Sequence, residues 1–371
     1  MSDKKFLDVF PPVTDVASYI SAINRIVSED PNFKGVYVFR GEPQYRETYC
    51  TPGIFRKNVL NENLYYEKSL LNTLRHNKLT TKDSYLENAI DAQHGEFPSR
   101  LLDVTYNCLN ALYFAVTPFY RKNERMYDNK DGIVYVFCVE EIYSPSAKNV
   151  KDCYDAIIDK NKEWFKGQPI FGKNHKFIDH AKLNDRIIAQ QGAFILFQGE
   201  DVDKLPAYMV KGFSIPSSSK EKIRKELSLM FGINTASIYP EIFNEVNELT
   251  EKSKNLVTDT FCWENEMDGV LRNLQKELDF YLNELYLEDD TDKQCKLSYH
   301  VETIINSYRV GLIKFYNDYD KCSCMEASKS ELEKRIEEYD KKVKAFIEQV
   351  QIICGANVKI SSDLIIKEKR C

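Results

Sequence analysis

The sequence predicts an α+β protein in which a mixed N-terminal domain with a central sheet and flanking helices precedes an all-helical C-terminal region. In residues 1–243, apolar patterns of helical period alternate with short apolar runs bounded by Gly. In residues 244–371, nearly every apolar pattern has helical period. With 371 residues, 43% of them hydrophobic, the chain is long enough to build two cores.

The first half is expected to contain helices and strands in mixed order. Thr14 is placed to cap a helix whose apolar residues recur from Val16 to Val27. Further helices are expected around Leu64 to Leu74 and from Asn107. Strands are expected at 36–39, 132–139, 193–197 and 207–215, and a last helix from 217–219 to Gly232.

The second half is expected to form a helical hairpin or bundle. Three apolar faces recur at steps of three or four, at 271–285, 301–312 and 332–350. The polar segment Leu287 to Gln294 separates the first two. These helices could pack on themselves, pack on the first domain or form a homodimer surface, and the sequence leaves these alternatives open.

Composition and charge limit the classes of function. No apolar run approaches the roughly 18 residues that span a bilayer, and the N-terminus lacks a signal-peptide core, so we expect a cytoplasmic protein with no membrane partner. Residues 241–371 carry 19 Lys and Arg against 27 Asp and Glu, and residues 1–240 carry 32 against 30. Neither part shows a basic stripe, which disfavours nucleic acid as a partner.

The ten cysteines are scattered, and only Cys322 and Cys324 lie close together, without a nearby His. We therefore expect reduced thiols and no metal site.

Three polar segments are candidates for a site. The first is Arg40-Gly41, at the end of the strand expected at 36–39. An Arg there is costly to desolvate unless an anion or carbonyl groups meet it, or unless it forms an internal salt bridge, for example with Asp103.

The second segment is QHGEFPSRLLDVT, residues 93–105. If its backbone is extended, Asp103 and Thr105 share one face. Thr105 or Asn107 could simply cap the helix that follows, and His94 could be structural, but the segment holds more polar groups than a cap requires. The third segment, RIIAQQGAF, places Gln190 and Gln191 before a strand, where one amide could bind a ligand.

Together these motifs resemble the signature of the FRG domain family. The matching stretches run from about Val36 to Ile242 and comprise FRGE, Pro52 with Phe55-Arg56, QHGEFPSRLLDVTYNCLNALYFAV, DGIVYVF, RIIAQQGAF and SIYPEI. Ser99 stands where the family usually has Thr, with shifted spacing, and Val104 stands where an aromatic is common. Such domains occur in bacterial, phage and mobile-element proteins, which implies a part in phage defence or a toxin-like activity.

The order of the motifs is also similar to the layout of ADP-ribosyltransferases. These enzymes carry an Arg or His on a first strand, a hydroxyl on a strand that leads into an A-x-x-F-A helix, and a Glu or Gln at a later strand. Arg40, Thr105 with ALYFA (residues 111–115) and Gln190 or Gln191 follow that order. The similarity implies NAD as the cofactor and a macromolecule as a candidate acceptor.

The layout similarity assigns roles to individual residues. Arg40 would bind the pyrophosphate or ribose, Asp103 and Thr105 would orient the nicotinamide ribose, and Gln191 would bind a ribose hydroxyl. Tyr106 or Phe114 would stack on the nicotinamide ring. The predicted catalytic set is Arg40, Asp103, Thr105 and Gln191, and the predicted ligand-binding set is Gly41, His94, Arg100, Tyr106 and Gln190.

Two other functions compete with this enzyme. The same pocket could recognise a nucleotide without turnover, while the helical tail mediates assembly. A nuclease with His94 and Asp103 as acid and base is weaker, because no carboxylate cluster for a metal accompanies them.

Overall fold

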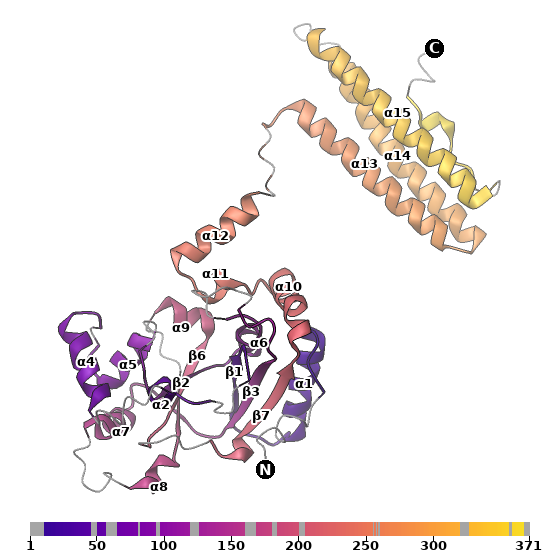
Figure 1. Ribbon diagram of the computed structural model, residues 1–371. Coiled ribbons are helices and arrows are strands. Elements are labelled where there is room, and N and C mark those ends of the chain that lie inside the picture. Colours follow the sequence, from indigo (N-terminus) through magenta and orange to yellow (C-terminus); the bar gives the residue numbers. More distant parts are fainter. Residues whose placement is uncertain are drawn as a thin grey trace. The chain divides into compact units, whose positions relative to one another are not determined.

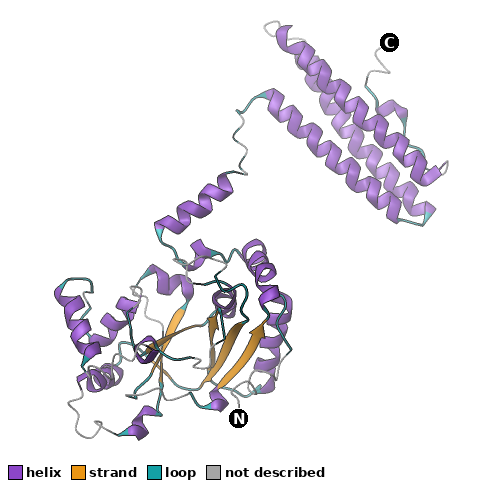
Figure 2. Ribbon diagram, viewed as in Figure 1, coloured by secondary structure: helices purple, strands orange, loops and turns teal. Residues whose placement is uncertain are grey.

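The computed structural model describes residues 11–45, 50–56, 65–80, 82–93, 97–118, 126–159, 168–179, 184–199, 205–254, 256, 258, 260–319, 326–355 and 358–366. The chain divides into two compact units, residues 1–255 and 256–371. The first is α+β and the second is all-helical, as the sequence predicts (Figure 1, Figure 2). Within the described residues, no helix has the length and apolar character needed to cross a membrane.

Seven described strands of the first unit form one sheet in the order β4-β5-β6-β2-β1-β3-β7. All neighbouring strands are antiparallel except β4 and β5. The strands are β1 (Val36–Glu42), β2 (Leu101–Thr105), β3 (Gly132–Val139), β4 (Ile142–Tyr143), β5 (Lys176–Ile178), β6 (Gly192–Leu196) and β7 (Val210–Ile215).

Helices cover the sheet in two groups. The described helices of this unit are α1 (Val16–Glu29), α2 (Gly53–Arg56), α4 (Tyr66–His76), α5 (Tyr85–Ala92), α6 (Cys108–Val116), α7 (Lys148–Asp159), α8 (Pro169–Gly172), α9 (Asp185–Gln190), α10 (Lys220–Phe231), α11 (Thr235–Ile238) and α12 (Ile242–Ser253). Helices α1, α6 and α10 bury their apolar faces against β1, β3 and β7. Helices α4, α5 and α7 form a separate core with β2, β5 and β6.

The sheet is weakly joined between β1 and β2. These strands pair only where Phe39 lies opposite Thr105, whereas β1 pairs with β3 along its whole length, from Val36 to Glu42. On its other side β2 pairs with β6 over all five of its residues, from Leu101 to Thr105. The strands therefore separate beyond one point of contact, which leaves backbone groups of β2 open to side chains from β1.

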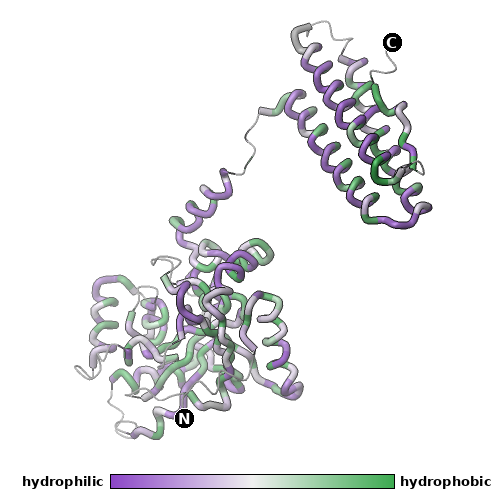
Figure 3. The backbone as a smooth tube through the Cα atoms, turned by 45° about the vertical axis from the view of Figure 1, so that its right-hand side comes forward, coloured by the Kyte–Doolittle hydropathy of each residue, from purple (hydrophilic) through white to green (hydrophobic). Residues whose placement is uncertain are grey.

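The second unit is a bundle of three long helices, α13 (Trp263–Leu287), α14 (Thr291–Tyr319) and α15 (Glu326–Cys354). Hydrophobic and hydrophilic residues alternate around each helix (Figure 3), and the apolar ones form one core. The turn between α13 and α14 falls within the predicted segment 287–294. The segment after α15 joins this core, because the buried Asp340 carboxylate accepts a hydrogen bond from the Ile366 amide at 2.7 Å. The bundle thus packs on itself.

Several details differ from the sequence-based expectations. Asp15, not Thr14, caps α1, because its carboxylate accepts the Ser18 amide at 2.8 Å and the Ser18 hydroxyl accepts from the Asp15 amide. Strand β7 begins at Val210, three residues after the predicted start, because Ala207–Met209 forms a 3-10 turn. The predicted helix start near Leu64 lies outside the described residues.

Candidate functional site

A cavity of about 570 Å³ opens where β1 and β2 separate. Residues from β1, β2, β6, α2, α5, α6 and α9 line it, together with the segments around Phe97 and Tyr239. Among the residues that the structure describes, the charged ones that line it are Arg40, Arg56, Arg186 and Asp103. Three guanidinium groups against one carboxylate favour an anionic ligand, and phosphate oxygens suit the planar guanidinium fork.

Arg40 fills the gap between the separated strands. Its NH1 donates to the Asp103 carbonyl oxygen at 2.7 Å, and its Nε donates to Glu42 Oε1 at 3.0 Å. Burial acts to lower the pKa of Arg40, but Glu42, Cys50 and Asp103 together raise it above its ordinary value. The side chain stays charged and is 17% exposed, so it is held in place while still reached from the cavity.

Glu42 supports the arginines from behind the cavity. Its Oε1 lies 3.0 Å from Arg40 Nε and 3.6 Å from Arg56 NH2. Its side chain is 6% exposed, and its Oε2 has no hydrogen-bond partner among the described residues. One buried carboxylate therefore orients two guanidinium groups.

Asp103 carries the carboxylate of the cavity. Strand β2 buries its other residues, but the Asp103 side chain is exposed. The cavity walls still limit its hydration, and this burial raises the pKa of Asp103, while Arg40, Arg186 and Arg56 act to lower it. A carboxylate in this environment can stabilise a cation and can also accept a proton.

Arg186 and Tyr239 form another wall. The guanidinium carbon of Arg186 lies 4.7 Å from the centre of the Tyr239 ring, and its NH1 lies 3.8 Å from Glu241 Oε1. Phe114 meets Tyr239 edge to face at 6.2 Å between ring centres. This arrangement offers a cation beside aromatic surface, which suits a phosphate attached to an aromatic base.

Thr105 and Gln190 line the cavity, but both also make internal hydrogen bonds. The Thr105 hydroxyl donates to the Gln190 carbonyl at 2.6 Å and accepts the Asn107 amide at 3.0 Å. Gln190 Nε2 donates to the Ile238 carbonyl at 3.2 Å. The cap of α6 is Asn107, whose side chain accepts from the Leu109 amide at 2.9 Å. Thr105 thus joins the end of α9 to β2.

Gln191 and Tyr106 were predicted to belong to the site but are not among the cavity-lining residues. Gln191 ends α9 in the left-handed conformation, with φ 48° and ψ 47°. The Tyr106 hydroxyl donates to Asp179 Oδ1 at 2.7 Å, and burial together with this carboxylate raises its pKa. Of the two adjacent glutamines, Gln190 is therefore the one at the cavity.

Arg100, a predicted ligand-binding residue, is 2% exposed and has structural partners instead. Its Nε donates to Glu67 Oε2 at 2.7 Å, and its NH1 donates to the carbonyls of Phe197 and Gly199 at 3.0 and 2.9 Å. It does not line the cavity. His94 lies outside the described residues.

Gly41 lines the cavity, but packing also explains why it is glycine. A β-carbon at Gly41 would collide with the Ala111 carbonyl oxygen of α6. Strand β1 can therefore lie directly against α6 only because this residue lacks a side chain.

The sequence analysis assigned no role to four further cavity residues. Arg56 and Arg186 occur in motifs of the sequence resemblance, which was their only signal. Gln93 Oε1 and the Thr117 hydroxyl are buried and have no hydrogen-bond partner among the described residues. Buried polar atoms without a partner are rare, so these two atoms are candidates to hydrogen-bond a ligand in the cavity.

No group of three or more His, Cys, Asp or Glu side chains in the described part of the chain could hold a metal ion. Cys322 and Cys324 lie outside that part.

Comparisons with known proteins identify one domain. Residues 35–124 match the FRG domain family, a range that contains β1, β2 and α6. No curated protein and no solved structure matches the chain. The chain therefore carries an FRG domain, whose Arg40 and Asp103 line the cavity between β1 and β2.

Proposed function

We propose that the cavity between β1 and β2 binds NAD and cleaves its bond to nicotinamide. The observation that carries the proposal is the adjacency of β6, β2 and β1 in the sheet. Arg40 on β1, Thr105 on β2 and Gln190 at the end of α9, just before β6, all line one cavity, and they follow one another along the chain as in the ADP-ribosyltransferase layout. The proposal is therefore supported by a spatial arrangement in addition to an order along the chain.

Each charged group has a role in this reaction. Arg40, Arg56 and Arg186 bind the pyrophosphate, because guanidinium forks match phosphate oxygens. Phe114 and Tyr239 provide aromatic surface for a base. Asp103 stabilises the positive charge that develops on the ribose carbon in the transition state.

The chemical step balances without a further reagent. The bond between ribose C1′ and the nicotinamide nitrogen breaks, and its electron pair leaves with nicotinamide, which becomes neutral. The oxygen of water, or a nucleophilic atom of an acceptor, forms the new bond to C1′. Its proton passes to the Asp103 carboxylate and then to solvent.

The test is release of nicotinamide from NAD by the purified full chain, with free ADP-ribose measured by mass spectrometry. We expect Arg40→Lys to weaken NAD binding because it keeps the charge but loses the fork. We expect Asp103→Asn to lower turnover by about 100-fold, the effect of losing one electrostatic group, with binding retained. Arg272→Ala, at an exposed position in the other unit, is the matched control. Unchanged release in both site variants would refute the proposal.

A second candidate function is nucleotide recognition without turnover. It is favoured by the internal hydrogen bonds of Thr105 and Gln190, because two of the polar groups needed for catalysis are then already occupied and, among the described lining residues, Asp103 is the acidic group that remains. In this case NAD or another nucleotide would bind in an Arg40-dependent way without nicotinamide release. The helical unit would then mediate assembly, including homodimer formation.

The resemblance to FRG domains of phage and mobile elements supports a cellular role in phage defence or as a toxin. An enzyme that consumes NAD would stop the growth of its host cell. Expression of the wild-type chain in a bacterium should therefore lower cellular NAD and growth, and Asp103→Asn should abolish both effects. Growth arrest that persists in the variant without NAD loss would exclude this mechanism.

A further inference from the structure

A second hollow of the first unit, here called the side groove, lies beside the cavity. It has a volume of about 720 Å³ and is defined by Leu74, Leu79, Asp91, Phe97, Arg186 and Glu241. Phe97, Pro98 and Arg186 line both hollows. A molecule in the side groove would therefore reach the wall of the proposed NAD cavity.

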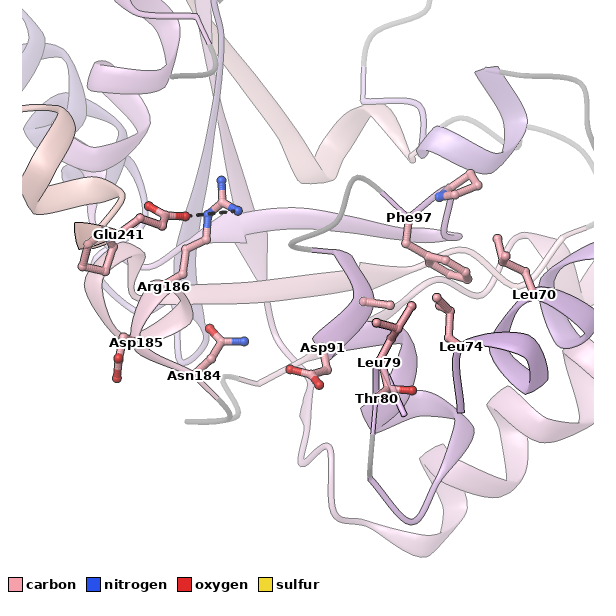
Figure 4. Close-up of a pocket in the computed structure, with 13 residues that line it drawn as sticks. Leu70, Leu74, Leu79, Thr80, Asp91, Phe97, Asn184, Asp185, Arg186 and Glu241 are labelled. Carbon is pink, nitrogen blue, oxygen red and sulfur yellow. Dashed lines mark ion pairs between the residues drawn. The ribbon is translucent and has the colours of Figure 1, made fainter. Parts of the chain in front are cut away.

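The side groove has an apolar end and a polar end. Figure 4 shows Leu70, Leu74, Leu79 and Phe97 gathered at one end, with Arg186 and its partner Glu241 at the other. Leu79 is 69% exposed although it is a large apolar side chain. Apolar surface left open in a groove indicates a site for an apolar group of a partner.

The groove is acidic. Among the described lining residues, three carboxylates, those of Asp91, Asp185 and Glu241, face the guanidinium of Arg186. Asp185 lies in the first turn of α9, where a carboxylate stabilises the helix, and Glu241 pairs with Arg186. Asp91 forms no hydrogen bond or ion pair with any described residue.

A buried polar group provides an independent observation. Thr80 lines the groove and is 5% exposed, yet its hydroxyl has no hydrogen-bond partner within the part of the chain that the structure describes. Such a group is satisfied when a ligand supplies a donor or acceptor. The acidic surface disfavours a nucleotide in this groove and favours a cation.

We infer that the side groove docks the acceptor of the reaction, a peptide segment with a Lys or Arg beside an apolar residue. This inference rests on the proposed function, because it assigns the acceptor to the NAD-cleaving site. The apolar residue packs against Leu79 and Phe97, and the basic residue lies near Asp91. The segment then leads past Arg186 to the cavity.

Transfer of ADP-ribose to this acceptor breaks the same bond as hydrolysis and needs no further reagent. The basic residue at Asp91 only anchors the segment, and the nitrogen of a second Lys or Arg side chain, further along the segment, forms a bond to ribose C1′ in the cavity while the bond to nicotinamide breaks. The proton that the nitrogen loses passes to Asp103. Nicotinamide leaves as a neutral molecule.

The test uses labelled peptides with Leu-Arg-Leu, Leu-Glu-Leu or Ser-Arg-Ser at their centre and the same flanking Lys as acceptor, measured with the full chain by fluorescence anisotropy. We expect the first to bind most tightly. Leu79→Ser should weaken its binding about tenfold through lost apolar contact. Asp91→Asn should weaken it about fivefold through a lost exposed ion pair. Leu229→Ser, at a position 74% exposed on α10, and Asp152→Asn, at an exposed position on α7, are the matched controls.

Nicotinamide release without peptide is measured in the same samples. NAD cleavage together with groove-dependent binding of Leu-Arg-Leu and transfer of ADP-ribose to it supports the inference. Cleavage without selective peptide binding, or equal binding of Leu-Glu-Leu, overturns it and leaves the proposed function intact. Groove-dependent binding without NAD cleavage refutes the proposed function, and with it the acceptor role.

Discussion

The structure indicates that Arg100 stabilises the first unit and does not bind a ligand, and this can be tested by mutation. It forms a buried ion pair with Glu67, in which both side chains are 2% exposed and Nε and Oε2 are 2.7 Å apart. The Tyr154 hydroxyl donates to the other carboxylate oxygen at 2.7 Å. The pair joins the residue before β2 to α4 and α7, and Arg100 is not among the cavity-lining residues, although its neighbours Ser99 and Leu101 are.

Replacing Arg100 with Met removes the guanidinium and leaves the buried Glu67 carboxylate with the Tyr154 hydroxyl as its remaining donor among the described residues. Loss of one partner of a buried ion pair costs about 3–5 kcal/mol. Adding Glu67→Gln to Arg100→Met should recover part of this loss, because the uncompensated charge is then removed.

The assay is urea unfolding followed by hydrogen exchange and mass spectrometry, which reports the two units separately. The second unit should be unaffected by Arg100→Met. Arg335→Met is the contrasting control, since its pair with Asp268 at 2.7 Å is more exposed, at 13% and 39%, and should contribute about 1 kcal/mol or less. Wild-type stability of Arg100→Met combined with loss of nucleotide binding would refute the structural assignment.

Three further predictions concern stability. Gly41→Ala should destabilise the first unit by about 3 kcal/mol, because the new methyl group collides with α6. Gly311→Ala, which has open space around it on α14, should instead stabilise the second unit by about 1 kcal/mol. Urea midpoints of both variants equal to those of the wild type would contradict this. Burial lowers the pKa of Lys220 from 10.5 to about 8, so between pH 8 and pH 10.5 the unfolded state binds more protons than the folded state. The free energy of unfolding should therefore rise with pH across this range by at most about 3 kcal/mol, and the rise should be absent in Lys220→Met. Burial in the cavity raises the pKa of Asp103, so the free energy of unfolding should fall as the pH rises above 3.8. Asp103→Asn should therefore raise the melting temperature at neutral pH, and a lower melting temperature would show that the pKa of Asp103 is not raised.

Local patterns predict the elements of this fold better than they predict its site. The helical periods at 271–285 and 332–350 needed no tertiary information, because each helix buries one face in the bundle core. The segment from about residue 140 to 190 contributes two short strands, β4 and β5, that the sequence analysis did not identify. Strands of two or three residues are too short to show a period.

The site depends on which strands are neighbours in the sheet. Local sequence patterns predict single strands but not which strands pair. The order along the chain identified Arg40 and Thr105, and Asp103 was added because it shares a strand face with Thr105; all three line the cavity. The same reasoning selected Arg100, because an isolated Arg in a motif gives no sign of a buried Glu67 that lies 33 residues earlier. Long-range ion pairs therefore mimic ligand-binding residues in a single sequence.

The three residues of the Phe-Arg-Gly motif have different tasks that follow from strand alternation. Phe39 and Gly41 point to the α6 side of β1, where Phe39 joins the apolar core and Gly41 allows close contact with the helix. Arg40 lies between them and cannot enter that core. Because β1 and β2 separate after Phe39, no backbone amide of β1 reaches the Asp103 carbonyl oxygen. The Arg40 guanidinium donates a hydrogen bond to this oxygen instead. The packing that requires Phe and Gly is thus also what places the Arg at the cavity, so Gly41→Ala should impair ligand binding even at temperatures where the chain remains folded.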